Sequence, residues 1–138
     1  MNNQYRYIIR ETGLKVTPTR LAVIKFFDQT KKPAHVADII KALVSQKIYA
    51  DQATIYRIVE NFYKKGLINR LQFQKRKFYY ETNREEHHHA ICNSCGKIED
   101  ISNCSLQRLE KEIEKKHNFK VESHSLEFFG TCSNCLQK

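Results

Sequence analysis

The sequence predicts an α+β fold in which an N-terminal winged helix-turn-helix precedes a small α+β domain. Three observations predict it. The first half of the 138-residue chain contains amphipathic helical runs, and two short β-prone runs follow them. The second half alternates β-prone segments with one charged helical run and carries all five cysteines. These patterns divide the chain into a first domain at 1–82, a polar hinge at 83–86 and a second domain at 87–138.

Three helices are predicted in the first half. The first begins at Thr17 and Pro18, because Thr is a favourable N-cap and Pro suits the first helical position, and it ends before Pro33. The second spans residues 35–46. The third begins after Asp51, which can cap it, and stops at Gly66. Its apolar residues recur at the helical spacing: Ile55, Ile58, Val59 and Phe62.

A β-hairpin is predicted after the third helix, because residues 67–73 and 77–81 are β-prone and flank the polar turn Gln74-Lys75-Arg76. Beyond the hinge we expect a short apolar run into Cys92, strands at 97–101 and 120–129, and a helix at 105–117. That helix is predicted to bury three residues: Leu106, Leu109 and Ile113. A unit of this size needs a metal, a partner chain or both to be stable.

The net charge of +9 is concentrated in the first half. Residues 1–82 hold 16 Lys and Arg against 6 Asp and Glu, whereas residues 83–138 hold 8 against 9. This distribution favours a polyanion as the partner of the first half, although a solvated basic surface is the alternative. The apolar stretches are too short to span a membrane, and residues 1–10 do not resemble a secretory signal. We therefore expect a cytoplasmic protein with no membrane partner.

Four of the five cysteines form two pairs with the spacing of zinc ligands. The pairs are Cys92/Cys95 and Cys132/Cys135. Each pair offers two sulfur ligands in a tight turn, and four thiolates suit a closed, structural Zn²⁺ site. Unligated buried thiols and a redox disulfide are the alternatives. The remaining Cys104 is interpreted as a small core thiol.

A run of histidines and nearby carboxylates predicts a second metal site. The residues are Glu81, His87, His88, His89 and Asp100, with His35 and His124 elsewhere in the chain. In a strand, His87 and His89 point to one side and His88 to the other, so two separate sites can form. Imidazole and carboxylate ligands suit Fe²⁺, Mn²⁺, Zn²⁺ or Co²⁺. The alternative is a surface loop that binds metal adventitiously.

The N-terminal end of the third helix carries side chains suited to reading DNA. They are Gln52, Thr54, Tyr56 and Arg57. Arg can bind guanine or phosphate, and Thr or Tyr can contact a thymine methyl group in the major groove. The basic residues of the turn region, Lys75, Arg76 and Lys77, can add phosphate contacts. An ordinary amphipathic helix with a polar outer face is the alternative.

Four motifs in order resemble the ferric uptake regulator (Fur) family. They are Gly13-Leu14-Lys15-Val16-Thr17-Pro18-Thr19-Arg20, Ala53-Thr54-Ile55-Tyr56-Arg57, the run from His87 through Cys92-Asn93-Ser94-Cys95-Gly96-Lys97, and His124-Ser125-Leu126-Glu127-Phe128-Phe129-Gly130-Thr131-Cys132. The resemblance covers almost the whole chain. It implies a homodimeric DNA-binding regulator, usually a repressor of metal-uptake or oxidative-stress genes, that binds an AT-rich palindromic operator.

The resemblance also implies roles for particular residues. Glu81, His87, His89 and Asp100 match the regulatory metal site at the hinge, and His88 and His124 match a further site found in many members. Lys15, Tyr56 and Arg57 match DNA-contacting positions. The metal fixes the two halves in a DNA-binding posture, so a metal-dependent population shift is the expected mechanism.

The chain departs from the family pattern at three places. Pro33 stands where a hinge ligand is usual, and we expect His35 to replace it. Gln107 stands where the additional site usually takes an acidic residue, and Glu86 or Glu110 can compensate. The loop between Glu81 and His87 is about one residue shorter than the family pattern.

The choice of effector metal follows from one position. Glu81 stands where the peroxide-sensing branch tends to have Asp, and no cysteine lies near it as in many zinc-sensing members. The resemblance therefore favours Fe²⁺ sensing, with peroxide, zinc or manganese sensing as alternatives. Three other classes compete: a small iron enzyme, a constitutive zinc-ribbon DNA-binding protein and a metal buffer. Of these, the enzyme leaves the winged-helix half without a function.

Overall fold

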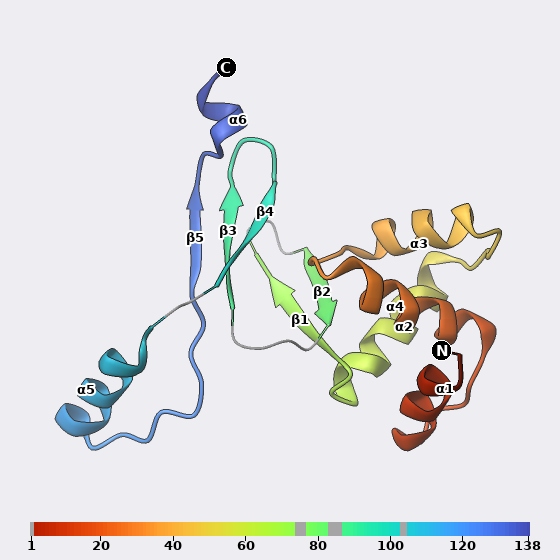
Figure 1. Ribbon diagram of the computed structural model, residues 1–138, viewed down its shortest axis with the longest axis horizontal. Helices are drawn as coiled ribbons and strands as arrows, with labels where there is room; N and C mark the ends of the chain where they lie inside the picture. The colour runs from red at the N-terminus through yellow and green to blue at the C-terminus, as the bar shows by residue number, and fades with distance from the viewer. Residues whose placement is uncertain (1, 74–76, 83–86, 103–104) are drawn as a thin grey trace. The chain divides into compact units, whose positions relative to one another are not determined.

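The structure is a computed structural model that describes residues 2–73, 77–82, 87–102 and 105–138 (Figure 1). The chain divides into two compact units, Met1–Asn83 and Arg84–Lys138. The predicted hinge at 83–86 lies outside the described residues, as do four residues to which a role was assigned: Lys75, Arg76, Glu86 and Cys104.

The first unit is a winged helix. Its elements are α1 (Asn2–Glu11), α2 (Pro18–Thr30), α3 (Val36–Ser45), α4 (Gln52–Lys64), β1 (Ile68–Gln72) and β2 (Phe78–Thr82). Strands β1 and β2 pair antiparallel, with Ile68 opposite Thr82 and Gln72 opposite Phe78. The three predicted helices and the hairpin are confirmed. Helix α1 was not predicted from its polar sequence; Tyr5 and Ile9 are its buried residues among those whose burial is described.

Side chains cap the helices at the predicted residues. Thr17 accepts a hydrogen bond from the backbone N–H of Arg20 at 3.2 Å, and Asp51 accepts one from the N–H of Thr54 at 2.7 Å. These bonds satisfy N–H groups that have no partner inside a helix. The hydrogen bonds from Thr54 also hold the pKa of Asp51 below its usual value. Gly66 (φ +77°) follows α4 with a backbone conformation that favours glycine.

The apolar core of the described residues lies entirely in the first unit. It is built by the inner faces of the four helices and by the hairpin residues Ile68 and Tyr80. The predicted inner face of α4 is buried in full: Ile55, Ile58, Val59 and Phe62. This core fixes α4 with its opposite face in solvent.

The second unit contains a three-stranded sheet with two helices. Its elements are β3 (His88–Cys92), β4 (Ile98–Ile101), α5 (Gln107–His117), β5 (Glu127–Gly130) and α6 (Ser133–Leu136). The strand order is β4-β3-β5, in which β4 is antiparallel and β5 parallel to β3 (Figure 1). Strand β3 is therefore central and carries two of the predicted metal ligands, His88 and His89.

Two predictions for the second unit were wrong. Helix α5 buries none of its residues: Leu109 is 51% exposed and Ile113 is only half-buried, as is Leu106 just before the helix. The strand predicted at 120–129 is shorter, since only Glu127–Gly130 pairs with β3, beginning opposite His89. No helix in the described part of the chain is long and apolar enough to cross a membrane.

Candidate metal centres and DNA-binding surface

The four paired cysteines converge in the second unit. Cys92 ends β3, Cys95 lies in the turn that follows it, and Cys132 is the N-cap of α6, which contains Cys135. Gly96, at φ +78°, allows that turn to close through its N–H, which donates to the carbonyl of Cys92 at 2.9 Å. The N–H of Cys132 donates to the Sγ of Cys92 at 3.3 Å, which joins the two pairs.

The geometry of this cluster fits a structural Zn²⁺ site. The four Sγ atoms all lie within 4.8 Å of one another, and those of Cys95 and Cys132 are 3.7 Å apart. Tetrahedral zinc with Zn–S bonds of about 2.3 Å requires sulfur separations of about 3.8 Å. The four sulfurs are not bonded to one another, and Cys95 is exposed, which does not match a set of buried thiols.

The electrostatics of the cluster also call for a cation. Backbone N–H groups of Cys132 and Cys95 stabilise a thiolate and lower the pKa of Cys92 to about 5. Hydrogen bonding to the sulfurs of Cys132 and Cys95 raises the pKa of Cys135 to about 12. Four thiolates this close repel one another, so all four can ionise together only around a positive ion.

A second group in the same unit offers nitrogen and oxygen ligands. The ligand atoms of His87, His89 and Asp100 lie within 4.8 Å of one another. His89 and Asp100 face each other across β3 and β4, and their Nε2 and Oδ1 atoms are 3.9 Å apart. The rings of His87 and His89 have centroids 4.8 Å apart. Glu81 belongs to the first unit, where it is buried near the end of β2.

His88 meets His124 in a separate place. Their Nε2 atoms are 3.2 Å apart, and His88 is buried. The carboxylate of Glu110 on α5 lies 2.6 Å from Nδ1 of His124 and so orients that ring. Two nitrogens bound to one tetrahedral metal at about 2.0–2.1 Å would be about 3.3 Å apart, so this pair fits a shared ion. Gln107 is exposed on α5.

From the sequence, either Glu86 or Glu110 could supply the acidic residue of the additional metal site. Fourteen residues separate it from His124, and no helical or strand periodicity links a helix to the irregular segment that carries His124. Its role follows from tertiary structure.

His35 has a structural role in the first unit. It is the N-cap of α3, where its Nδ1 accepts a hydrogen bond from the N–H of Ala37 at 3.2 Å. Asp38 accepts one from the backbone N–H of His35 at 3.0 Å. Its Nε2 is therefore the atom with which His35 could bind a metal.

The predicted DNA-reading residues lie on the solvent side of α4. Gln52, Tyr56 and Arg57 are exposed and Thr54 is half-buried in the first turns of the helix. Lys77 precedes β2 and is exposed, as is Lys15, whose carbonyl accepts a hydrogen bond from Arg20 at 2.8 Å. The exposed N-terminal end of an amphipathic helix in a winged helix is suited to enter a DNA groove.

Comparison with known proteins points to one family. The model of the ferric uptake regulator family matches residues 11–129. The ferric uptake regulation protein of Yersinia pestis is 36% identical over 134 residues, which cover 94% of this chain and 90% of that protein.

Two solved structures are similar over nearly their whole length. The ferric uptake regulator of Helicobacter pylori, described as having three functional metal-binding sites, gives a TM-score of 0.86 at 26% identity and covers 99% of this chain and 91% of its own. The structure of the ferric uptake regulator of Francisella tularensis with iron has a TM-score of 0.82 and is 31% identical in sequence. The match covers 90% of this chain and 96% of that one.

The cysteine cluster leads to a prediction for metal content. We expect Cys135→Ser to lose Zn²⁺ and to lower the thermal stability of the second unit, because three remaining thiolates hold the ion less tightly. Elemental analysis after dialysis against a chelator, together with thermal unfolding, measures both effects. Cys104→Ser is the matched control and should keep one Zn²⁺ per chain. Full zinc retention by Cys135→Ser would contradict a four-cysteine site.

Proposed function

The chain belongs to the ferric uptake regulator family of metal-responsive, DNA-binding transcription regulators, which are not enzymes, and we propose that it is an Fe²⁺-responsive repressor. The observation that carries this proposal is the group formed by His87, His89 and Asp100. Its nitrogen and oxygen ligands suit an exchangeable ion such as Fe²⁺ or Mn²⁺, whereas the four-cysteine cluster suits permanent zinc. A protein with both has one site for stability and another for sensing.

Glu81 is proposed as the ligand that connects sensing to DNA binding. It lies on β2 of the DNA-binding unit, whereas the two histidines and Asp100 belong to the second unit. An ion held by ligands from both units binds best at one relative orientation of these units, so it shifts the population toward that orientation. We propose residues 1–82 as the DNA-binding domain, 87–138 as the dimerisation domain, and the Nε2 of His35 as a further ligand.

Iron is proposed as the effector on three grounds. The site has no thiolate, and Glu81 occupies the position where peroxide-sensing relatives tend to have Asp. The similar Francisella tularensis regulator was solved with iron. Peroxide sensing and zinc or manganese sensing are the alternatives. The pair His88 and His124 is proposed as an additional metal site. The similar Helicobacter pylori regulator is described as having three functional metal-binding sites.

The proposed partners are DNA and a second copy of the chain. Exposed apolar side chains of the second unit would be covered in a homodimer: Leu109, Phe119, Phe128 and Phe129. Two recognition helices in a dimer would read two half-sites of an AT-rich palindrome about one helical turn apart. Lys15 and Lys77, with Lys75 and Arg76, would contact phosphates. Such a regulator would act in the cytoplasm, where a bacterial chromosome lies.

Arg57 tests the choice of recognition helix. We expect Arg57→Ala to weaken binding to an AT-rich palindromic duplex at least tenfold and to leave zinc content unchanged, because the lost contacts lie in the groove. Tyr56→Ala should act similarly. Fluorescence anisotropy at fixed salt measures the affinity. Arg108→Ala removes an equal charge from α5, where the side chain is 93% exposed, and is the control. Unchanged affinity for both α4 variants would disprove this assignment.

Glu81 tests the metal switch. We expect Mn²⁺, an oxygen-stable substitute for Fe²⁺, to tighten binding of the wild-type protein to the palindromic duplex at least tenfold, which is about 1.4 kcal/mol of coupling. Glu81→Ala and His89→Ala should lose this gain and retain the structural zinc. Glu122→Ala removes an exposed carboxylate from the second unit and should behave like the wild type. Metal-independent affinity in the wild type would favour a constitutive zinc-ribbon DNA-binding protein.

A further inference from the structure

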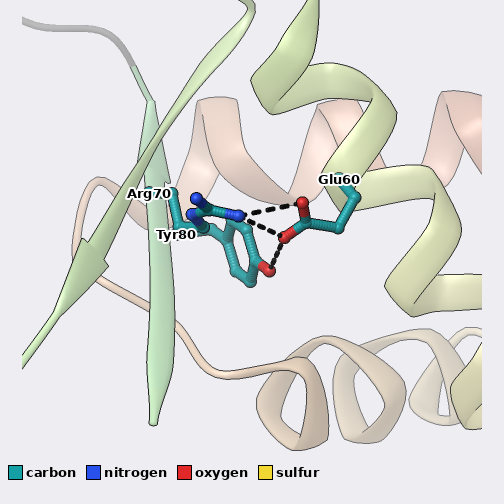
Figure 2. Close-up of polar contacts among 3 residues, drawn as sticks. All are labelled: Glu60, Arg70 and Tyr80. Atoms are coloured by element: carbon teal, nitrogen blue, oxygen red, sulfur yellow. Dashed lines mark hydrogen bonds and ion pairs between the residues drawn. The ribbon is translucent and has the colours of Figure 1, made fainter. Parts of the chain in front are cut away.

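Three side chains meet between the proposed recognition helix α4 and the two strands of the hairpin (Figure 2). Nη1 of Arg70, on β1, lies 3.2 and 3.0 Å from the two carboxylate oxygens of Glu60, on α4. The hydroxyl of Tyr80, on β2, donates to Oε1 of Glu60 at 2.6 Å. The carboxylate of Glu60 therefore binds both strands of the wing at once. We call these residues the wing clamp.

The charge of Arg70 is compensated by the carboxylate of Glu60 and by two aromatic rings. Its guanidinium stacks on the ring of Tyr63 at 4.3 Å and on that of Phe78 at 4.7 Å. Its side chain is 31% exposed and that of Glu60 is 21% exposed. Burial acts to lower the pKa of Arg70, but the hydrogen bond and charge of Glu60 raise it above its usual value. The guanidinium is thus stacked on two rings and paired through Nη1 with Glu60, and this pairing weakens its attraction for outside anions.

Tyr80 extends the clamp to the rest of the helix-turn-helix. Its side chain is fully buried, and burial followed by the hydrogen bond to Glu60 raises the pKa of its hydroxyl. Its backbone N–H and carbonyl each bond with Ala34, just before α3, at 2.8 Å. Tyr80 therefore bonds with the residue that precedes α3 through its backbone, and with α4 through the carboxylate of Glu60.

The clamp also reaches the DNA-reading end of α4. Glu60 lies four residues after Tyr56, so both side chains share one helical face. Tyr56 is one of the groups that raise the pKa of the Tyr80 hydroxyl, after burial and Glu60, so the two side chains lie near each other. A change in the clamp therefore alters the support of a proposed base-reading side chain as well as the position of the wing.

A purely stabilising role explains this arrangement poorly. A partly buried ion pair incurs a desolvation cost that can equal its Coulombic gain, and apolar residues of similar size would often serve as well. Glu60 does, however, fix one geometry, because it accepts hydrogen bonds from Arg70 on one strand and from Tyr80 on the other, and both form only in one orientation of the hairpin. In a DNA-binding protein it also decides whether an arginine on the wing is available to phosphates.

We propose that Glu60, Arg70 and Tyr80 are positioning residues that set DNA specificity: they fix the wing against the recognition helix and keep the charge of Arg70 from phosphates. This inference rests on the proposed function, in which α4 reads DNA. Free arginines on a DNA-binding surface strengthen binding to any sequence, since phosphate contacts carry no sequence information. The clamp therefore raises the ratio of specific to non-specific affinity.

The test compares two duplexes with the Mn²⁺-loaded, full-length protein. The first is the duplex that the wild type selects from a random 30-base-pair pool, and the second is a shuffled version of it. We expect Glu60→Gln to bind the selected duplex about five- to tenfold more weakly. It should bind the shuffled duplex at least as tightly as the wild type, with a salt dependence steeper by about one unit. Glu11→Gln makes the same charge change at an exposed site of α1 and is the control.

Two further variants separate positioning from folding. Glu60→Gln with Arg70→Gln should return non-specific affinity and salt dependence to the wild-type values while the loss on the selected duplex persists. Tyr80→Phe removes one hydroxyl and should weaken only the selected duplex, so it tests the proposal even if Glu60→Gln folds poorly. The proposal would be wrong if Glu60→Gln and Tyr80→Phe lost equal affinity for both duplexes, that is, if the ratio of specific to non-specific affinity stayed unchanged. If the wild type selects no duplex, the proposed function itself fails and the clamp with it.

Discussion

Sulfur coordination takes the place of an apolar core in the second unit, and the proposed sensing function of that unit depends on it. Every member of the apolar core cluster belongs to the first unit, and in the described part of the second only His88, His89 and Cys92 are buried. Conformational entropy must be offset by some interaction, and a small sheet with an uncovered helix offers little apolar burial. Four thiolates around one cation supply that interaction, and a partner chain would add the rest.

Strand β3 connects this structural requirement to sensing. It ends at Cys92 in the cysteine cluster and carries His88 and His89 on opposite faces a few residues earlier. A metal at one end of the strand therefore fixes the positions from which both histidines act. His89 meets Asp100 across β4, whereas His88 meets His124, whose ring is oriented by Glu110. The structural ion is thus proposed to preorganise ligands for the exchangeable one.

Sequence periodicity predicted the elements that have their own caps and inner faces, and it failed where burial depends on other parts of the chain. Thr17 and Asp51 cap the predicted helices. The spacing within the pairs Cys92/Cys95 and Cys132/Cys135 predicted the four-cysteine cluster. Leu109 was expected to be buried from its helical spacing, but periodicity cannot show whether anything covers that face. The wing clamp escaped prediction because Glu60 and Arg70 are ten residues apart on different elements and meet only when the hairpin folds back.

Metal binding at the nitrogen and oxygen site is proposed to be coupled to specific DNA binding, and thermodynamic linkage offers the most direct test of this coupling. Calorimetric titration of Mn²⁺ into the zinc-containing wild-type protein, with and without a saturating selected duplex, measures the coupling from the metal side. We expect the duplex to raise Mn²⁺ affinity by the same factor, tenfold or more, by which Mn²⁺ raises duplex affinity. Equal Mn²⁺ affinities with and without the duplex would contradict the claim, however tightly the ion binds.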